Sequence, residues 1–344
     1  MTINLKRALL ATTAMGLSAT AAMAEGDLFI YNWTDYTPPA LVEKFEAETG
    51  ISVTVDTYDS NETLLAKLQS GANGYDIVVP SHNFVPIFIS EGLLQPINAP
   101  DLEGYDNIVA NFSDPSWDPG NVYSIPWQWG TTAYTVNTKV FGGDINTYDV
   151  LFDAPKELQG QIGMFKSPDD AIMMASIYLD LPLCSEDPAD MQKILDLLEA
   201  QKPNVKIYAT DGTLERLVSG DVAANMNWSG YSMRARAEND ALAYGFPKEG
   251  VIAWVDNIVV PAEAPNYDNA IKFIEFLMQP ENIAIASDYA GFANGIEGSV
   301  EFMKEELTSA PEMSVPEGTP LVFSQTCSPA AVDLQNRVWT ALLQ

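Results

Sequence analysis

Residues 28–50 read LFIYNWTDYTPPALVEKFEAETG, and they combine two secondary-structure patterns with an unusual cluster of side chains. An apolar run ends in the aromatic and polar residues NWTDY at 32–36, and two prolines follow. Prolines suit the first turn of a helix, and Gly50 is a typical residue just past the end of one. The stretch therefore predicts a strand that ends in aromatic and acidic side chains, with a helix directly after it.

The next segments repeat this alternation. Residues 51–56, ISVTVD, alternate apolar with polar side chains, which is typical of a strand. A capped helix is predicted from Ser60 or Asn61 to Gly71, and YDIVVPS at 75–81 predicts a short buried strand. The order strand, helix, strand, helix, strand indicates an α/β fold with a parallel sheet.

The rest of the chain is less regular. An extended crossing segment is predicted at 123–137 and an amphipathic helix at 192–205. Strands are expected from Gly220 and from Gly250, and helices at 269–291 are expected to break near Pro280. For 344 residues we expect one large or two medium domains. No repeat or flexible linker is visible, so the chain would pass between two domains inside ordered segments.

The chain is strongly acidic, with 17 basic and 47 acidic residues and a net charge of -30. Such a field repels nucleic acids and anionic membrane surfaces, so no nucleic-acid partner is expected. It attracts small cations. On charge alone, the favoured interpretation is that the acidity only keeps an exported protein soluble.

The N-terminus has the pattern of a secretory signal peptide at 1–24. Lys6 and Arg7 precede a short apolar stretch, and Ala22-Met23-Ala24 forms a small-residue cleavage site. No cysteine follows to carry a lipid anchor, and no later run approaches the ~20 apolar residues of a membrane span. We expect an exported, soluble protein.

The two cysteines, Cys184 and Cys327, have two possible states. An oxidising compartment permits a disulfide between them, whereas two free buried thiols fit the sequence as well.

Few residues of the usual catalytic types are present. The chain has one histidine, His82, so a multi-histidine metal site or proton relay is impossible. No G-x-S-x-G elbow, P-loop or dinucleotide-binding fingerprint appears. We expect no catalytic residue, metal or cofactor, and we place His82 in a turn near a ligand or solvent. A carboxylate-dependent hydrolase stays as an alternative, because acids are abundant.

A binding site for an organic cation needs simpler groups. A carboxylate holds an ammonium through charge-assisted hydrogen bonds, and indole faces attract the cation and pack against methylenes. Trp33, Trp228 and Trp254 with Asp35 and Asp256 would supply such a site. Several of these residues follow predicted strands, where ligands bind in open α/β sheets. The alternative is that each tryptophan is a core residue.

Five segments, taken together and in the same order along the chain, resemble the periplasmic spermidine/putrescine-binding proteins of bacterial ABC importers. The resemblance spans nearly the whole mature chain and is weakest around 140–200 and after 295. The segments are YNWTDYTPPALVEKFEAETGISVTVDTYDSNETLLAKLQSG, GYDIVVPS, PWQWGTTAYTVNT, GDVAANMNWSG and WVDNIVVPAEAPN.

The resemblance implies a two-domain, hinge-closing (type II) periplasmic binding protein of the α/β class, with a mixed, mainly parallel sheet in each domain. The N-terminal lobe would comprise residues 25–134 and 251–300, and the C-terminal lobe 135–250 and 301–344. A polyamine would bind in the cleft between the lobes and pass to an inner-membrane ABC permease. The protein would be a periplasmic monomer.

The family pattern also implies roles for individual residues. Aromatic residues would box the ligand and sandwich its methylene chain, acids would hold its ammonium groups, and Asp256 would be the central carboxylate. The ligand-binding positions carried over are Trp33, Thr34, Asp35, Tyr36, Ser81, Asp170, Trp228, Tyr231, Trp254, Asp256 and Phe292.

Three positions depart from that pattern. Met173 and Tyr231 stand where the family pattern has acids, and Phe292 stands where it usually has tyrosine. Fewer acids would leave a second ammonium poorly paired. We hypothesise a shorter or singly charged amine, or one with a neutral far end. A plain diamine remains the default ligand, and an amino acid derivative is an alternative. A ferric ion is disfavoured because no adjacent tyrosine pair occurs.

Overall fold

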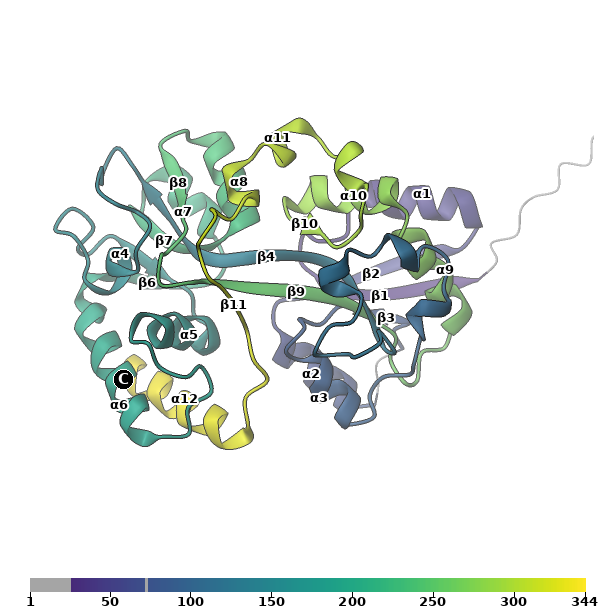
Figure 1. The fold of residues 1–344 in the computed structure, drawn as a ribbon, viewed down its shortest axis with the longest axis horizontal. Helices are drawn as coiled ribbons and strands as arrows, with labels where there is room; N and C mark the ends of the chain where they lie inside the picture. The colour runs from purple at the N-terminus through teal and green to yellow at the C-terminus, as the bar shows by residue number, and fades with distance from the viewer. Residues whose placement is uncertain (1–25, 72–73) are drawn as a thin grey trace, which may run out of the picture.

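The computed structural model describes residues 26–71 and 74–344. The predicted signal peptide, residues 1–24, lies outside the described residues. Figure 1 shows two groups of helices and strands, joined by two long strands that cross between them. We call the group around β1–β3 the N-terminal lobe and the group around β5–β8 the C-terminal lobe.

The N-terminal lobe begins with the predicted alternation of strands and helices. Strand β1 lies parallel to β2 on one side and to β3 on the other. Gly50 ends α1 in the left-handed conformation, with its N–H bonded to Glu46 O, and Ser60 caps α2 by accepting from the Thr63 N–H. The strand predicted at 75–81 is shorter than expected. The elements are β1 (Asp27–Trp33), α1 (Pro39–Thr49), β2 (Ser52–Tyr58), α2 (Asn61–Gln69), β3 (Ile77–Val78) and α3 (Val85–Ser90).

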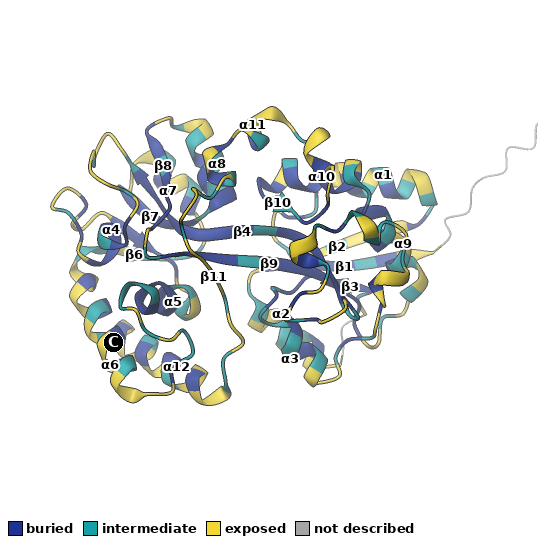
Figure 2. Ribbon diagram, in the orientation of Figure 1, coloured by how far each residue is buried: buried dark blue, intermediate teal, exposed yellow. Residues whose placement is uncertain are grey.

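Two long antiparallel strands, β4 (Ser124–Asn137) and β9 (Val251–Val259), connect the lobes. They pair from Ser124 opposite Val259 to Thr132 opposite Ile252. Both strands are buried along most of their length (Figure 2). The extended crossing segment predicted at 123–137 is therefore confirmed.

The strands form one continuous mixed sheet in the order β2-β1-β3-β9-β4-β7-β5-β6. Because β4 and β9 belong to both lobes, the two expected sheets are joined. The remaining strands are β5 (Ile162–Met164), β6 (Val205–Tyr208), β7 (Ala224–Trp228), β8 (Leu242–Gly245), β10 (Ala293–Asn294) and β11 (Leu321–Phe323).

Helix boundaries correct two sequence predictions. The helix expected at 192–205 is α6 (Pro188–Gln201), because Asp187 caps its start and Pro203 stands in the 3-10 turn that follows. The strand expected from Gly220 ends at Trp228 as predicted, but β7 begins only at Ala224 because Gly220 still caps the end of α7. The other helices are α4 (Asp149–Phe152), α5 (Pro168–Tyr178), α7 (Thr213–Ser219), α8 (Ser229–Glu238), α9 (Tyr267–Leu277), α10 (Pro280–Ala290), α11 (Glu305–Thr308) and α12 (Pro329–Leu343).

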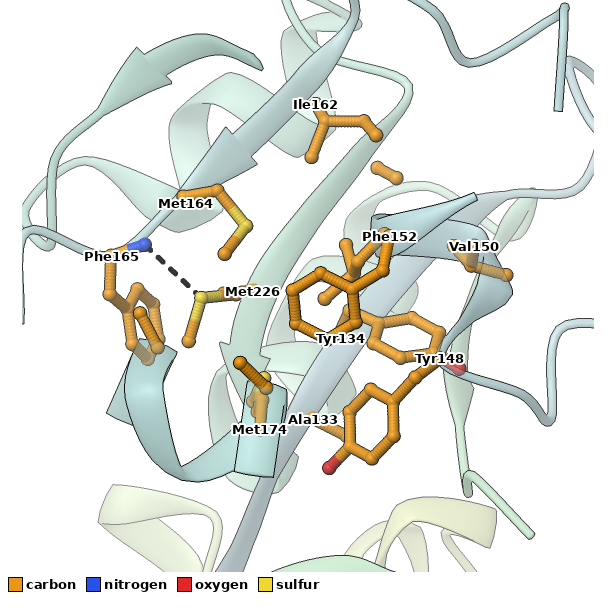
Figure 3. Packing of buried hydrophobic residues seen from close by; sticks show 14 of the residues in the cluster. Ala133, Tyr134, Tyr148, Val150, Phe152, Ile162, Met164, Phe165, Met174 and Met226 are labelled. Atoms are coloured by element: carbon orange, nitrogen blue, oxygen red, sulfur yellow. Dashed lines mark hydrogen bonds between the residues drawn. The ribbon is translucent and has the colours of Figure 1, made fainter. Parts of the chain in front are cut away.

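Each lobe has a hydrophobic core of its own. The C-terminal lobe is packed around Tyr134, Tyr148, Phe165 and Met226, and Figure 3 shows these side chains together. The largest cluster of the N-terminal lobe joins α1, α9 and α10 to the sheet through residues such as Phe45 and Phe273.

A third segment, residues 321–328, also runs between the lobes. Strand β11 pairs with β9 in parallel, and Cys327 forms a disulfide with Cys184 of the C-terminal lobe. Of the two states that the sequence left open, the structure shows the disulfide and not two free thiols.

His82 ties the same segment to the N-terminal lobe. It lies in a turn, as predicted, but it is buried instead of facing solvent. Its Nδ1 accepts from the Val255 N–H, so Nε2 carries the proton and donates to Ser324 O at 3.0 Å. Burial lowers the pKa of His82 to about 4, which keeps the ring neutral at pH 7.

The disulfide closes a long loop, since its cysteines are separated by 143 positions. Replacing both, Cys184→Ser with Cys327→Ser, should lower the free energy of unfolding by about 2–4 kcal/mol, because the unfolded chain gains freedom. Denaturant titration measures this, and the wild type under reducing conditions should match the double variant. Equal denaturant midpoints for the oxidised wild type and the double variant would contradict the predicted stabilisation by the disulfide.

Candidate functional site

A buried carboxylate, Asp256 on β9, is the centre of the candidate site. The Ser81 hydroxyl donates to its Oδ1 at 2.7 Å, and the Tyr36 hydroxyl donates to its Oδ2 at 2.8 Å. Asn61 holds Ser81 in turn: its Nδ2 donates to Ser81 Oγ at 3.1 Å, and its Oδ1 accepts from the Ser81 N–H at 3.0 Å. Each oxygen of Asp256 thus has one protein partner and keeps a lone pair for a ligand.

The sheet brings these groups together from distant parts of the sequence. Ser81 follows β3 and Tyr36 follows β1, and β1 and β3 are parallel neighbours, so both residues emerge at the same edge. Ser81 also forms an isolated bridge with Asp256. At that edge, Trp33 donates its indole N–H to Val79 O and packs on Tyr58.

The protonation of Asp256 depends on its surroundings. Burial raises the pKa of its carboxyl to about 7, while the hydrogen bonds from Ser81 and Tyr36 act in the opposite direction. Burial also raises the pKa of Tyr36 well above its usual value, so its hydroxyl stays a donor. Without a cation, ionised Asp256 is costly, and a bound ammonium would favour the ionised form.

Aromatic rings enclose the carboxylate on the N-terminal side. Phe292 is buried between Tyr36, at 6.0 Å between ring centroids, and Trp254, at 5.0 Å. Gly130 on β4 makes room for them, because a Cβ there would lie 2.7 Å from the Trp254 ring and 3.0 Å from Phe292. Trp254 is fixed by a 3.1 Å hydrogen bond from its Nε1 to Thr132 Oγ1.

Two aromatic residues approach from the C-terminal lobe. Trp228 packs on Phe165 and Tyr231, with ring centroids 4.5 and 5.2 Å apart. Both Trp228 and Tyr231 also pack against the main N-terminal cluster, so they reach across between the lobes. The predicted sandwich of Trp228 and Trp254 around a ligand stays a prediction.

The other predicted acids lie at the edges. Thr34 and Asp35 are exposed on the turn after β1, where Asp35 adopts a positive φ of 56°. Asp170 stands in the first turn of α5, and burial raises its pKa to about 6. Met173, one turn later, is buried in the C-terminal core, which accounts for an apolar residue at this position.

Two acids that the sequence reading did not select also meet here. Asp169 of α5 lies close to Glu62 of α2, on the opposite lobe. Desolvation and then the carboxylates of Glu62 and Asp170 raise the pKa of Asp169. Since Asp169 is exposed by surface area, water weakens this effect. Three acids therefore gather where the two lobes approach.

Comparison with known proteins decides the family. Residues 40–315 match the family described as bacterial extracellular solute-binding protein. This chain belongs to that family. Its sequence is 31% identical over 349 residues to a putrescine/agmatine-binding protein of Pseudomonas aeruginosa, covering 95% of each chain. It is 35% identical over 281 residues to a spermidine/putrescine-binding periplasmic protein of Salmonella typhimurium, covering 81% of this chain and 80% of that protein.

A solved structure shows the same fold. The putative spermidine/putrescine ABC transporter protein of Listeria monocytogenes superimposes with a TM-score of 0.85 at 32% identity, covering 92% of this chain and 99% of that one. The predicted fold class, a two-domain α/β periplasmic binding protein, is thereby confirmed for this solute-binding protein.

The sequence reading missed several residues of the site. Three of them lie at the starts of helices: Asn61, Glu62 and Asp169. Asn61 belongs to the site because it bonds Ser81, and Glu62 and Asp169 belong to it because they meet across the two lobes. Gln128 lies in the segment PWQWG, and the pairing of β4 with β9 sets it directly opposite Asp256. In the sequence, the only feature that distinguishes Gln128 is that this polar residue stands between two tryptophans.

The raised pKa of Asp256 has a consequence for this solute-binding protein without ligand. Because burial raises the pKa of Asp256 to about 7, the native carboxyl keeps its proton to about pH 7, whereas the unfolded chain releases it near the usual pKa of 3.8. Stability therefore falls as pH rises between these values, by ~1.4 kcal/mol per unit of pKa shift. Asp256→Asn cannot ionise and should be increasingly more stable than wild type from pH 4 to 8.

Thermal unfolding of the ligand-free proteins across this pH range measures the difference. Asp169 and Asp170 titrate in both proteins, so the comparison isolates Asp256. A wild type that is more stable than Asp256→Asn at pH 8 would show that the native site stabilises the ionised carboxylate.

Proposed function

We propose that this protein is the solute-binding component of an ABC importer and captures organic amines of the polyamine class. The observation that carries the proposal is the buried Asp256 carboxylate, positioned by Ser81 and Tyr36 and surrounded by aromatic rings. A desolvated carboxylate in an aromatic site suits an ammonium. The net charge of -30 favours capture of cations, and the names of the relatives point to the same ligand class.

The lobes are proposed to be residues 25–134 with 251–300, and 135–250 with 301–344. Separate hydrophobic clusters on the two sides support this division. The connections at β4, β9 and 321–328 would act as the hinge, and the ligand would lie between Asp256 and the aromatic residues Trp228 and Tyr231.

We propose that electrostatic repulsion between acids opposes closure of the two lobes until a cation binds. Asp256 ionises at a cost when buried, and the acids Glu62, Asp169 and Asp170 repel one another where the lobes meet. An ammonium offsets both effects, so it stabilises the closed form more than the open form. The closed form would then dock on the membrane permease.

The remaining parts of the proposal concern location and state. The chain would be exported through residues 1–24, work in the periplasm as a monomer and catalyse no reaction. In the described part of the chain, no helix combines the length and apolarity needed to cross a bilayer.

Isothermal titration of the chain from Glu25 onward with putrescine and spermidine tests the function. Asp256→Ala and Trp254→Ala should each weaken binding by tenfold or more, ~1.4 kcal/mol, because one removes the counter-charge and the other a cation-binding face. Circular dichroism should show a retained fold.

Two variants serve as matched controls. Asp149 also accepts a hydrogen bond from a tyrosine hydroxyl, that of Tyr178, and Trp339 packs on Tyr208 on the far side of the C-terminal lobe. Asp149→Ala and Trp339→Ala should leave amine affinity unchanged. Wild-type affinity in both site variants would remove the proposed site.

A further inference from the structure

Gln128 lies beside the candidate site and has not been given a role so far. On β4 it stands directly opposite Asp256, and Gly130 stands opposite Trp254. Residues directly opposite in an antiparallel pair project from the same face of the sheet. Gln128 therefore emerges on the face that carries Asp256 and Trp254, whose ring lies over Gly130.

The amide of Gln128 is buried and unpaired. The residue has no exposed surface, and neither its Nε2 nor its Oε1 has a hydrogen-bond partner within residues 26–71 and 74–344. The neighbouring Trp127 also has a buried indole N–H without a partner in the same part of the chain. Buried amides nearly always find partners, so the missing partner is expected to come from outside the chain.

The chemistry of the amide restricts that partner. Gln128 offers an acceptor at Oε1 and a donor at Nε2. A polyamine with charged nitrogens has N–H donors only, so it satisfies Oε1 and leaves Nε2 unpaired. A hydroxyl, carbonyl or carboxylate on the ligand supplies the missing acceptor.

A separate feature on the C-terminal side agrees with this reading. The guanidinium of Arg234 lies 4.0 Å from the centre of the Tyr231 ring, which itself reaches the N-terminal cluster. Its Nε is buried without a hydrogen-bond partner among the described residues. Arg234 thus places a positive charge against Tyr231, which attracts an acceptor group there, whereas the acids Glu62, Asp169 and Asp170 lie where α2 approaches α5.

We propose that Gln128 selects ligands by binding an acceptor group, so that the preferred ligand is an amine that also carries a hydroxyl, carbonyl or carboxylate. The ammonium binds Asp256, and the acceptor of the same molecule binds Gln128 Nε2. This inference rests on the proposed amine-binding function and narrows its ligand class.

Four-carbon amines that differ only at one end test the inference: putrescine, 4-aminobutan-1-ol, 4-aminobutyrate and butylamine. Titration calorimetry of the wild type should show at least one of the two acceptor-bearing amines binding tenfold more tightly than both putrescine and butylamine. Gln128→Met should abolish that preference, so that the acceptor-bearing amines bind no more tightly than butylamine measured on the same variant.

A second variant sharpens the test. Gln128→Glu keeps the size of the side chain but replaces the donor with an acceptor, so it should shift the preference toward putrescine. Gln201→Met is the matched control, because Gln201 is also a buried glutamine with an unpaired Oε1 but lies on α6, in the core of the C-terminal lobe. It should bind all four amines as the wild type does.

Two outcomes would overturn the inference in distinguishable ways. If the wild type prefers putrescine and both Gln128 variants keep that preference, amine binding stands but Gln128 does not select the ligand, and a buried water is its partner. If none of the four amines binds, the proposed function itself fails. Should Gln128→Met not fold, Gln128→Glu alone decides between these results.

Discussion

The structure depends on one constraint: a carboxylate is buried on a strand that both lobes share. Asp256 stands on β9, whose two ends belong to different lobes, and a buried carboxylate that ionises requires hydrogen bonds and a cation. Ser81 and Tyr36 supply the hydrogen bonds from neighbouring strand ends. Within residues 26–71 and 74–344, no basic side chain is among the groups that shift the pKa of Asp256, and in the proposed function an amine ligand supplies the cation.

The same strand links the site to the hinge. Ser81 contacts Asp256, and the next residue, His82, bonds both to β9 and to the segment that the Cys184–Cys327 disulfide fastens to the other lobe. A neutral His82 suits this role because it is one donor and one acceptor, each paired. Two consecutive residues thus connect the buried Asp256 carboxylate with a disulfide that fastens the segment to the C-terminal lobe.

Much of this could be predicted from local patterns, and the rest depends on tertiary contacts. The alternation at 28–71 predicted β1, α1, β2 and α2, because caps and periodicity are encoded within a few residues. The burial of His82, the pairing of the cysteines and the place of Gln128 follow from strand register and chain crossings that no short segment contains. Met173 shows what the family pattern could not predict: it stands where that pattern has an acid, but its side chain packs in the core of the C-terminal lobe.

Proton release on amine binding tests the central claim most directly. The measurement is calorimetric titration of the protein with an amine at pH 6 and at pH 8, in buffers that differ in ionisation enthalpy. The dependence of the binding heat on the buffer gives the number of protons released. If Asp256 holds the ammonium, binding at pH 6 releases protons from a carboxyl whose pKa lies near 7, and binding at pH 8 releases far fewer. Binding at pH 6 without proton release would contradict the account, because the ammonium would then lie away from the buried carboxylate.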